Sequence, residues 1–222
     1  MGTQRDITFV STAIKICGIS TPETLDAVID ARAEFVGFNF YPPSPRHVSL
    51  QDLSALAARA GSRVAKVGVF VDADDVLIGA AVEAGRLDAI QLHGEEPPAR
   101  AAELKQRFGI PVWKVIPVAT SADIARSADY RGAVDFMLFD AKTPKDAALP
   151  GGMGLRFDWT LLSGLDAGMP WGLAGGLTPA NVADAIGRTG APLVDTSSGV
   201  ETAPGDKDPD AIAAFCAAVR KV

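Results

Sequence analysis

PWGLAGGLTPANVADAIGRTGAPLVDTSSGV, residues 170–200, contains two short apolar runs that enclose one amphipathic segment. The runs PWGLA (170–174) and PLVDT (192–196) have the length of strands, and the segment between them has the length of a helix. A glycine- or serine-rich turn follows each run, which marks where each strand ends. The stretch therefore predicts a strand–helix–strand unit of a parallel sheet.

The same alternation continues from this stretch toward the N-terminus. The six further apolar runs are AIKIC (13–17), FVGFNF (35–40), AKVGVF (65–70), DAIQL (88–92), VWKVI (112–116) and DFMLF (135–139). Helix-start signals follow four of the eight runs, at Thr21-Pro22, at Ser49, at Thr178-Pro179 and at Asp208-Pro209. Eight strand–helix units without a break in composition predict an α/β fold, a single-domain (β/α)₈ TIM barrel over residues 1–222. The alternative on pattern alone is an open doubly wound sheet.

Composition narrows the classes of function. The chain has 222 residues and a formal net charge of −6, without a cluster of lysines and arginines, so nucleic acid is not an expected partner. No apolar stretch is long enough to cross a membrane, and the first residues do not resemble a secretory signal. Two cysteines are too few for a disulfide framework. We expect a cytoplasmic protein, monomer or homodimer, that acts on a small molecule.

Cys17 and Asp140 stand where two predicted strands end, on the face that carries the active site in barrels of this kind. Cys17 is a candidate nucleophile, proton acceptor or metal ligand, or simply a buried apolar side chain. No second cysteine or paired histidine lies nearby in sequence, so we expect no metal. Asp140 follows apolar residues that favour its acid form; the alternatives are a loop cap or an ion pair with Lys142. Cys216, on the apolar face of the last helix, is assigned to packing.

Arg46 and His93 follow two other predicted strands. Three prolines precede Arg46 in Tyr41–Arg46 and stiffen its loop, which suits a guanidinium that binds a carboxylate or phosphate. The alternative is an ordinary surface arginine. His93 is a candidate substrate-positioning residue, or a structural histidine bonded to a neighbouring loop.

Two glycine-rich loops follow the last two predicted strands. They contain Gly175 and Gly176 in one loop and Ser197, Ser198 and Gly199 in the other. Such loops turn backbone N–H groups toward an anion, and these two positions form the usual phosphate site of the fold. We therefore expect a phosphorylated ligand. No nucleotide-binding fingerprint is present, so neither a nucleoside triphosphate nor a dinucleotide is indicated.

Taken together, these residues resemble the phosphoribosylanthranilate isomerase family. The matching strings occur in the family's order and span nearly the whole chain: KICG (15–18), GFNFY (37–41), SPR (44–46), VGVFV (67–71), QLHGE (91–95), FDAK (139–142), GGMG (151–154), FDW (157–159), LAGGL (173–177), Pro179 with NV (181–182), and DTSSGVE (195–201). Each string alone is weak evidence for the family, but the ordered set is specific to it.

The resemblance implies a cofactor-free enzyme of tryptophan biosynthesis. Its reaction is the Amadori rearrangement of N-(5-phosphoribosyl)anthranilate to 1-(2-carboxyphenylamino)-1-deoxyribulose 5-phosphate. By motif position, Cys17 is the general base, Asp140 the general acid and Arg46 the residue that binds the anthranilate moiety. The two glycine-rich loops hold the phosphate, and His93, Gly152 and Asp195 line the substrate site. Met153 stands where a small hydroxyl residue is expected, which puts one substrate contact in doubt.

Three rival functions fit the sequence less well. A ribulose-phosphate type epimerase needs metal-binding histidines, whereas the chain has only His47 and His93. Indole-glycerol-phosphate synthase needs a set of catalytic lysines and glutamates on its strands, which the pattern does not contain. A non-catalytic phosphosugar-binding barrel is expected to have lost Cys17 or Asp140, and both are present.

Lys15 shares a strand face with Cys17, because side chains two residues apart point the same way. If Cys17 faces the barrel mouth, Lys15 lies one layer below it inside the barrel. A buried lysine needs a partner, and Asp195 on the last strand is a candidate, because the first and last strands of a closed barrel are neighbours. We predict this pair. The Lys15 ammonium either helps to lower the pKa of the Cys17 thiol or only fills the barrel interior.

Overall fold

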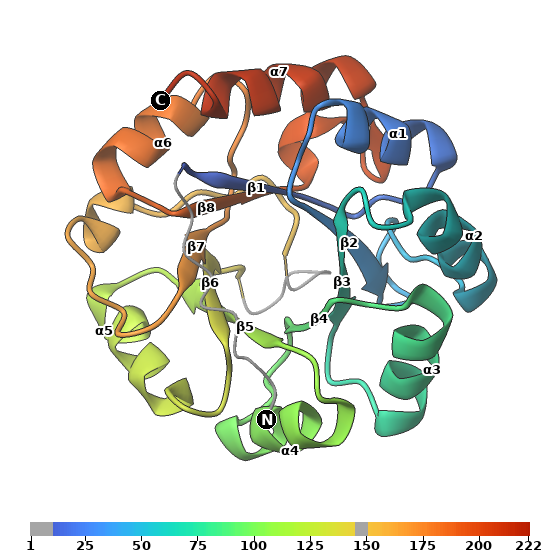
Figure 1. The fold of residues 1–222 in the computed structure, drawn as a ribbon. Coiled ribbons are helices and arrows are strands. Elements are labelled where there is room, and N and C mark those ends of the chain that lie inside the picture. Colours follow the sequence, from blue (N-terminus) through green and yellow to red (C-terminus); the bar gives the residue numbers. More distant parts are fainter. Residues whose placement is uncertain (1–10, 145–150) are drawn as a thin grey trace.

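Eight parallel strands form a closed barrel in the computed structural model, which describes residues 11–144 and 151–222. The strands, in spatial and chain order, are β1 (Ala13–Cys17), β2 (Phe35–Phe40), β3 (Ala65–Phe70), β4 (Ala89–Leu92), β5 (Val112–Val118), β6 (Phe136–Ala141), β7 (Trp171–Leu173) and β8 (Leu193–Thr196). Figure 1 shows the barrel along its axis, with the helices in a ring outside it. The predicted fold class is confirmed, and the open sheet is wrong.

The helices pack around the outside of the barrel. They are α1 (Pro22–Asp30), α2 (Leu50–Ala60), α3 (Asp75–Gly85), α4 (Pro98–Phe108), α5 (Ser121–Ala125), α6 (Val182–Thr189) and α7 (Pro209–Val219), with the 3₁₀ turns η1 (Arg126–Tyr130), η2 (Trp159–Leu162) and η3 (Ser198–Val200). Between β6 and β7 the described residues form one short element, η2. The single predicted domain extends over residues 1–222; residues 1–10 and 145–150 lie outside the described ranges.

Strand side chains are buried on both faces, which explains the uninterrupted apolar runs. One set fills the barrel interior and includes Val67, Trp113, Phe136, Leu138 and Leu193. The opposite set, with Ile14, Ile16, Val36 and Phe38, belongs to the larger core, where the strands pack on the helices. The inward positions at the carboxyl ends of the strands are therefore left for the site residues.

Three of the four helix-start predictions are confirmed. Thr21, Ser49 and Asp208 each accept a hydrogen bond from the first turn of the helix that follows. The prediction at Thr178-Pro179 is wrong, because α6 begins at Val182 and its N-cap is Asn181. The Asn181 side chain instead accepts the Thr178 N–H at 2.8 Å and donates to the Gly176 carbonyl at 3.0 Å. It stabilises the loop after β7 rather than the helix.

The predicted Lys15–Asp195 pair is present inside the barrel. β1 and β8 are neighbours with Lys15 opposite Asp195, and the ammonium lies 3.1 Å from the Asp195 carboxylate. Lys15 is completely buried, and desolvation of an unpaired lysine there would be costly. The ion pair therefore links β1 to β8, the first and the last strand of the barrel.

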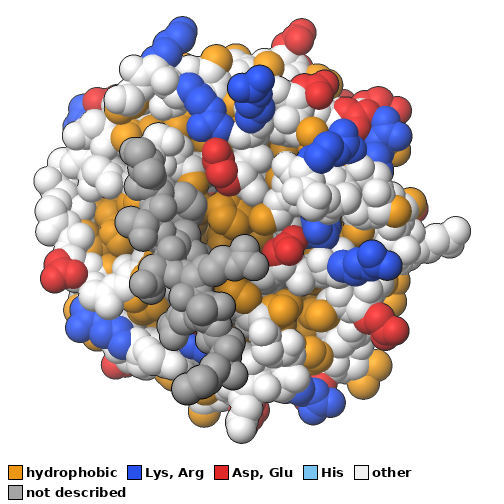
Figure 2. All heavy atoms as spheres, in the orientation of Figure 1, with side chains coloured by type: hydrophobic (Ala, Val, Ile, Leu, Met, Phe, Trp, Pro, Cys, Tyr) orange, Lys and Arg blue, Asp and Glu red, His pale blue; other side chains and the backbone are white. Residues whose placement is uncertain are grey.

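On the face shown in Figure 2, basic and acidic side chains are interspersed around the rim, without a basic patch. Among the described residues, no helix is long and apolar enough to span a membrane. One element was not predicted. After β8 and η3, a short antiparallel hairpin of β9 (Glu201–Ala203) and β10 (Asp206–Lys207) precedes α7.

Candidate active site

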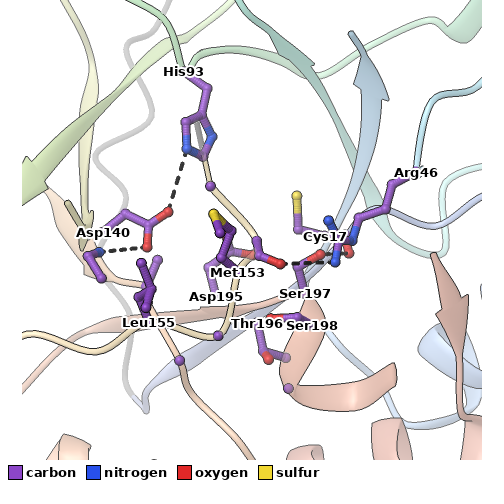
Figure 3. A pocket seen from close by; sticks show the side chains of 18 of the residues that line it. Cys17, Arg46, His93, Asp140, Met153, Leu155, Asp195, Thr196, Ser197 and Ser198 are labelled. Carbon is purple, nitrogen blue, oxygen red and sulfur yellow. Dashed lines mark hydrogen bonds and ion pairs between the residues drawn. The ribbon is translucent and has the colours of Figure 1, made fainter. Parts of the chain in front are cut away.

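A cavity of roughly 850 Å³, including its open mouth, lies at the carboxyl ends of the strands. Its lining contains all of the predicted site residues: Cys17, Arg46, His93, Asp140, Gly152, Gly175, Gly176, Asp195, Ser197, Ser198 and Gly199. Asn39 and Met153, which were not predicted as site residues, also line it. In Figure 3, Cys17 and Arg46 lie on one side of this cavity, and His93 and Asp140 lie on the other. Residues from both ends of the chain are thus brought into one site.

Lys15 is not part of this lining; it lies one layer below Cys17 inside the barrel, as its place on β1 predicted.

Cys17, the last residue of β1, lies in a notch that Gly37 of β2 leaves open. A side-chain carbon on Gly37 would lie 2.8 Å from Cys17 Sγ and 3.1 Å from Lys15 Nζ, so only glycine lets both groups occupy this place. Burial raises the pKa of the Cys17 thiol, and the nearby Lys15 ammonium opposes that rise. The lysine thus favours the thiolate, although the burial effect is larger.

Asn39 is the site residue that sequence reasoning missed. It points inward from β2, and its Oδ1 lies 3.7 Å from Cys17 Sγ, where it accepts a hydrogen bond from the thiol. Its string, GFNFY, was recognised only as part of a family pattern. Alternation along β2 from Gly37 would have placed Asn39 on the barrel face.

Asp140 points into the cavity from β6. Its Oδ1 accepts the Ala141 N–H at 2.7 Å, and its Oδ2 lies 3.5 Å from His93 Nε2. The alternative ion pair with Lys142 is wrong, because Lys142 donates to Asp123 at 2.9 Å. Lys142 follows the end of β6 and does not line the cavity, whereas Asp140 does. Hydrogen bonds from Lys142 and from backbone N–H groups hold the pKa of Asp123 well below its usual range.

His93 lies between Asp140 and the barrel interior. Its Nδ1 is 3.5 Å from Gln91 Nε2, one layer below on β4, and its Nε2 faces Asp140. Gln91 is completely buried, and its Oε1 has no hydrogen-bond partner among the described residues. His93 therefore contacts the carboxylate that we expect to act as the acid, rather than only a neighbouring loop.

Arg46 is not a surface arginine, because only 3% of it is exposed. Its Nε and Nη2 donate to the two carboxylate oxygens of Glu201, each at 2.7 Å, and Nη2 also donates to the Gly152 carbonyl at 3.1 Å. Its aliphatic stem crosses Gly18, where a side-chain carbon would lie 2.6 Å from Arg46 Cδ. The guanidinium is fixed at the edge of the cavity.

Residues 151–155 pass from the Asp140 side of the cavity to the glycine-rich loops. A side-chain carbon on Gly151 would lie 2.7 Å from His93 Nε2, and one on Gly152 would lie 2.7 Å from Arg46 Nη1. Met153 follows these glycines, lines the cavity and is 47% exposed. A thioether thus stands where a hydroxyl was expected, so this residue offers apolar contact rather than a hydrogen-bond donor.

The two glycine-rich loops pack directly on each other. Thr196 Oγ1 donates to the Leu177 carbonyl at 2.7 Å, and a side-chain carbon on Gly199 would lie only 1.8 Å from that oxygen. Gly175 and Gly176 have φ angles of 88° and 62°, which favour glycine. Within residues 11–144 and 151–222, the backbone N–H groups of these two glycines donate no hydrogen bond. The loops can therefore present free donors to an anion.

Among the described residues, no three His, Cys, Asp or Glu side chains gather closely enough to hold a metal ion. The arrangement offers one thiol, one carboxyl group beside an imidazole, one fixed guanidinium and a set of backbone donors. These groups suit proton transfer within an anionic ligand that is held at both ends.

Known proteins of one enzyme family are similar to this chain. A sequence model of the family described as N-(5′phosphoribosyl)anthranilate (PRA) isomerase matches residues 14–218. A protein of Rhodopseudomonas palustris strain BisB18 named N-(5′-phosphoribosyl)anthranilate isomerase is 53% identical over 207 residues, which cover 93% of this chain and 95% of that protein.

Two solved structures have the same fold at lower identity. Phosphoribosyl anthranilate isomerase from Thermotoga maritima has a TM-score of 0.85 and 35% identity, covering 95% of this chain and 100% of that one. A phosphoribosyl anthranilate isomerase in complex with reduced 1-(o-carboxyphenylamino)-1-deoxyribulose 5-phosphate has a TM-score of 0.83 and 33% identity, with the same coverage.

Proposed function

The chain belongs to the N-(5′-phosphoribosyl)anthranilate isomerase family, and we propose that Cys17 is its general base and Asp140 its general acid. The enzyme converts N-(5-phosphoribosyl)anthranilate to 1-(2-carboxyphenylamino)-1-deoxyribulose 5-phosphate in tryptophan biosynthesis. The observation that carries the assignment of roles is the position of the thiol and the carboxyl group on opposite sides of one cavity, between Arg46 and the glycine-rich loops.

Asp140 acts first, on the ribose ring oxygen. Its proton passes to that oxygen, the C1′–O bond breaks, and the ring opens to a Schiff base with the anthranilate nitrogen. Oδ2, beside His93, carries the proton, while Oδ1 is held by the Ala141 N–H. Because Oδ1 already accepts this hydrogen bond, the carboxyl group keeps one orientation toward the ligand.

Cys17 acts second, on C2′. Its thiolate removes the C2′ proton, the electrons of that bond move toward the iminium nitrogen, and the resulting enolamine relaxes to the aminoketone. The thiolate is the reactive form, and the Lys15 ammonium favours it within a buried site. One acid and one base complete the rearrangement, and the base returns its proton to the product or to solvent.

Arg46 and the glycine-rich loops hold the two ends of the substrate. Arg46 binds the anthranilate carboxylate through Nη1, because Nε and Nη2 already donate to Glu201 and to the Gly152 carbonyl. The N–H groups of Gly175, Gly176, Ser198 and Gly199 hold the phosphate. The Ser197 hydroxyl donates to the Cys17 carbonyl at 3.0 Å, so we assign its role in phosphate binding to its backbone. Gly152, His93 and Asp195 complete the lining.

Gly176→Val is expected to raise KM by at least about tenfold, because its side chain would block the approach of the phosphate to the backbone. At Gly176 a side-chain carbon would lie 2.7 Å from the Leu155 carbonyl, and φ there is 62°. Steady-state kinetics on the folded variant measure the effect. Gly190→Ala, at a C-cap of similar φ far from the cavity, is the matched control. A near-normal KM for Gly176→Val would contradict the phosphate placement.

Lys15→Met is expected to raise the pKa of the Cys17 thiol further, because the ammonium that opposes the burial effect is lost. Thiol titration in a Cys216→Ser background measures the Cys17 pKa directly. Lys66→Met is the control, since the Lys66 ammonium donates to the Gly61 carbonyl outside the barrel. An unchanged Cys17 pKa in Lys15→Met would assign Lys15 to barrel packing alone.

Complementation of a tryptophan auxotroph that lacks this isomerisation tests the activity in cells. In vitro, the loss of anthranilate-type fluorescence follows the reaction with the purified protein. Growth of the auxotroph with the wild-type chain, and no growth with Asp140→Asn, is the expected result. The cytoplasmic location and the monomeric or homodimeric state stay predictions, and light scattering after gel filtration measures the latter.

A further inference from the structure

Arg46 belongs to a buried cluster of three charges that the reaction scheme does not use in full. Glu201, at the start of β9, accepts from Arg46 and also from the Lys207 ammonium of β10. The side chains of Arg46, Glu201 and Lys207 are only 4%, 4% and 1% exposed. The β9–β10 hairpin, which sequence reasoning did not predict, therefore brings a second cation beside the ligand-binding arginine.

The charges in this cluster do not cancel. A pair of Arg46 and Glu201 alone is neutral, so it attracts an anion only weakly in a buried place. With Lys207 the cluster contains two cations and one carboxylate, so its net charge is positive by one unit. Although burial raises the pKa of Glu201, the hydrogen bonds from Arg46 and Lys207 hold that pKa below its usual value. Burial lowers the pKa of Lys207, and its hydrogen bond to Glu201 opposes that shift. Glu201 thus stays ionised and keeps both cations in place.

One donor group of Arg46 remains free within the described part of the chain, and it shows where this charge acts on a ligand. Nε and Nη2 are engaged by Glu201 and the Gly152 carbonyl, whereas Nη1 donates no hydrogen bond to any residue that the structure describes. Arg46 lines the cavity, so Nη1 is the donor available to a ligand. The hairpin also contacts the Arg46 loop, because a side-chain carbon on Gly205 would lie 2.7 Å from the Pro45 carbonyl.

We propose that Lys207 is a specificity-determining positioning residue, which supplies the net positive charge that lets the Arg46–Glu201 pair bind the carboxylate of the substrate. Lys207 acts through Glu201 and Arg46 and does not touch the ligand. Its ammonium also donates to Ser197 Oγ at 3.2 Å, which fixes it beside the strand end that carries the phosphate loop. The proposal rests on the proposed function, in which Arg46 binds the anthranilate carboxylate.

The test compares two ligands that differ only in the carboxylate. One is reduced 1-(o-carboxyphenylamino)-1-deoxyribulose 5-phosphate, and the other is the same reduced compound made from aniline. Inhibition constants for both are measured with the wild type, Arg46→Met, Lys207→Met and the double variant Glu201→Gln/Lys207→Met. The ratio of the two constants reports recognition of the carboxylate, and it cancels a general loss of binding or folding.

Lys207→Met is expected to raise the inhibition constant of the carboxylate ligand by about tenfold or more. The inhibition constant of the aniline compound is expected to change by less than about twofold. The double variant removes one charge of each sign and restores the single positive charge. We therefore expect it to recover most of the lost preference, although it has lost more contacts. A merely structural role for Lys207 predicts the opposite order, with the double variant weaker than the single one.

Arg46→Met separates the two possible failures. If Arg46→Met binds both ligands as selectively as the wild type, the proposed role of Arg46 is wrong. If Arg46→Met loses the preference but Lys207→Met keeps it, or if the double variant is no better than Lys207→Met, the inference about Lys207 is overturned. If Lys207→Met does not fold, Lys207→Gln is compared with Lys207→Arg, which keeps the charge and is expected to keep the preference.

Discussion

Cys17→Ser is expected to lower kcat by at least about two decades, because a positioned general base is typically worth about 10²–10⁴-fold. A loss of that size corresponds to about 3–5 kcal/mol of barrier. A serine hydroxyl keeps the shape of the thiol, but it is a far weaker acid and supplies no anion near neutral pH. Steady-state kinetics, with circular dichroism to confirm folding, measure the effect. Turnover within about tenfold of the wild type would remove Cys17 from the role of base.

Cys216→Ser is the matched control for this variant. Cys216 is buried on α7 against the helix layer, and burial raises the pKa of its thiol to about 11. It is absent from the cavity lining. We expect kcat to stay near the wild-type value while the protein loses some stability, because a hydroxyl replaces an apolar group in the core.

Asp140→Asn is expected to lower kcat by a similar factor, about two decades or more, while the substrate still binds. Asparagine keeps the shape and accepts the Ala141 N–H, but it has no acidic proton to give to the ring oxygen. The measurement is kcat and KM together, and KM is expected to change much less than kcat. Activity within about tenfold of the wild type would show that another group protonates the ring.

Asp123→Asn provides the comparison for this second variant. Asp123 is a carboxylate near the same barrel rim, but it accepts from Lys142 and from the backbone of Ala119 and Thr120. Its loss removes these structural hydrogen bonds, so we expect lower stability with kcat nearly intact. If kcat falls in Asp140→Asn but not in Asp123→Asn, the loss comes from the missing proton donor and not from the removal of a negative charge near the rim.

The profile of kcat/KM against pH is expected to be bell-shaped. A general base fails when it is protonated at low pH, and a general acid fails when it has lost its proton at high pH, so the rate falls on both sides. Burial raises the pKa of the Cys17 thiol, and the Lys15 ammonium opposes that rise, so the thiolate fraction depends on Lys15. Lys15→Met is therefore expected to lower the maximum of the profile. A flat profile would contradict the acid–base pair.

The barrel could be predicted from the sequence because its strands are short apolar runs buried on both faces. The Lys15–Asp195 pair followed from two rules, the alternation of side chains along a strand and the closure of the barrel between its first and last strands. Cys17 and Asp140 could be placed in one cavity because both lie at the carboxyl ends of strands, Cys17 as the last residue of β1 and Asp140 one residue before the end of β6. Their roles came from the family pattern rather than from the fold.

The support around Arg46 could not be predicted from local pattern. Glu201 and Arg46 are 155 residues apart, and the hairpin that carries Glu201 and Lys207 is only a few residues long. Such short strands have too few side chains for alternation to be visible. The start of α6 was misplaced for a related reason. The Thr178-Pro179 signal fits a helix start, but the Asn181 side chain binds the preceding loop and α6 begins after it.

The central claim is the division of labour between Asp140 at the ring oxygen and Cys17 at C2′. The most direct test is the deuterium isotope effect on kcat/KM for substrate labelled at C2′, measured in the wild type, Cys17→Ser and Asp140→Asn. In Cys17→Ser the removal of the C2′ proton limits the rate, so a primary isotope effect at least as large as in the wild type is expected. In Asp140→Asn ring opening limits the rate, so the isotope effect should fall toward unity. The reverse pattern, with the larger effect in Asp140→Asn, would contradict the assignment of both residues.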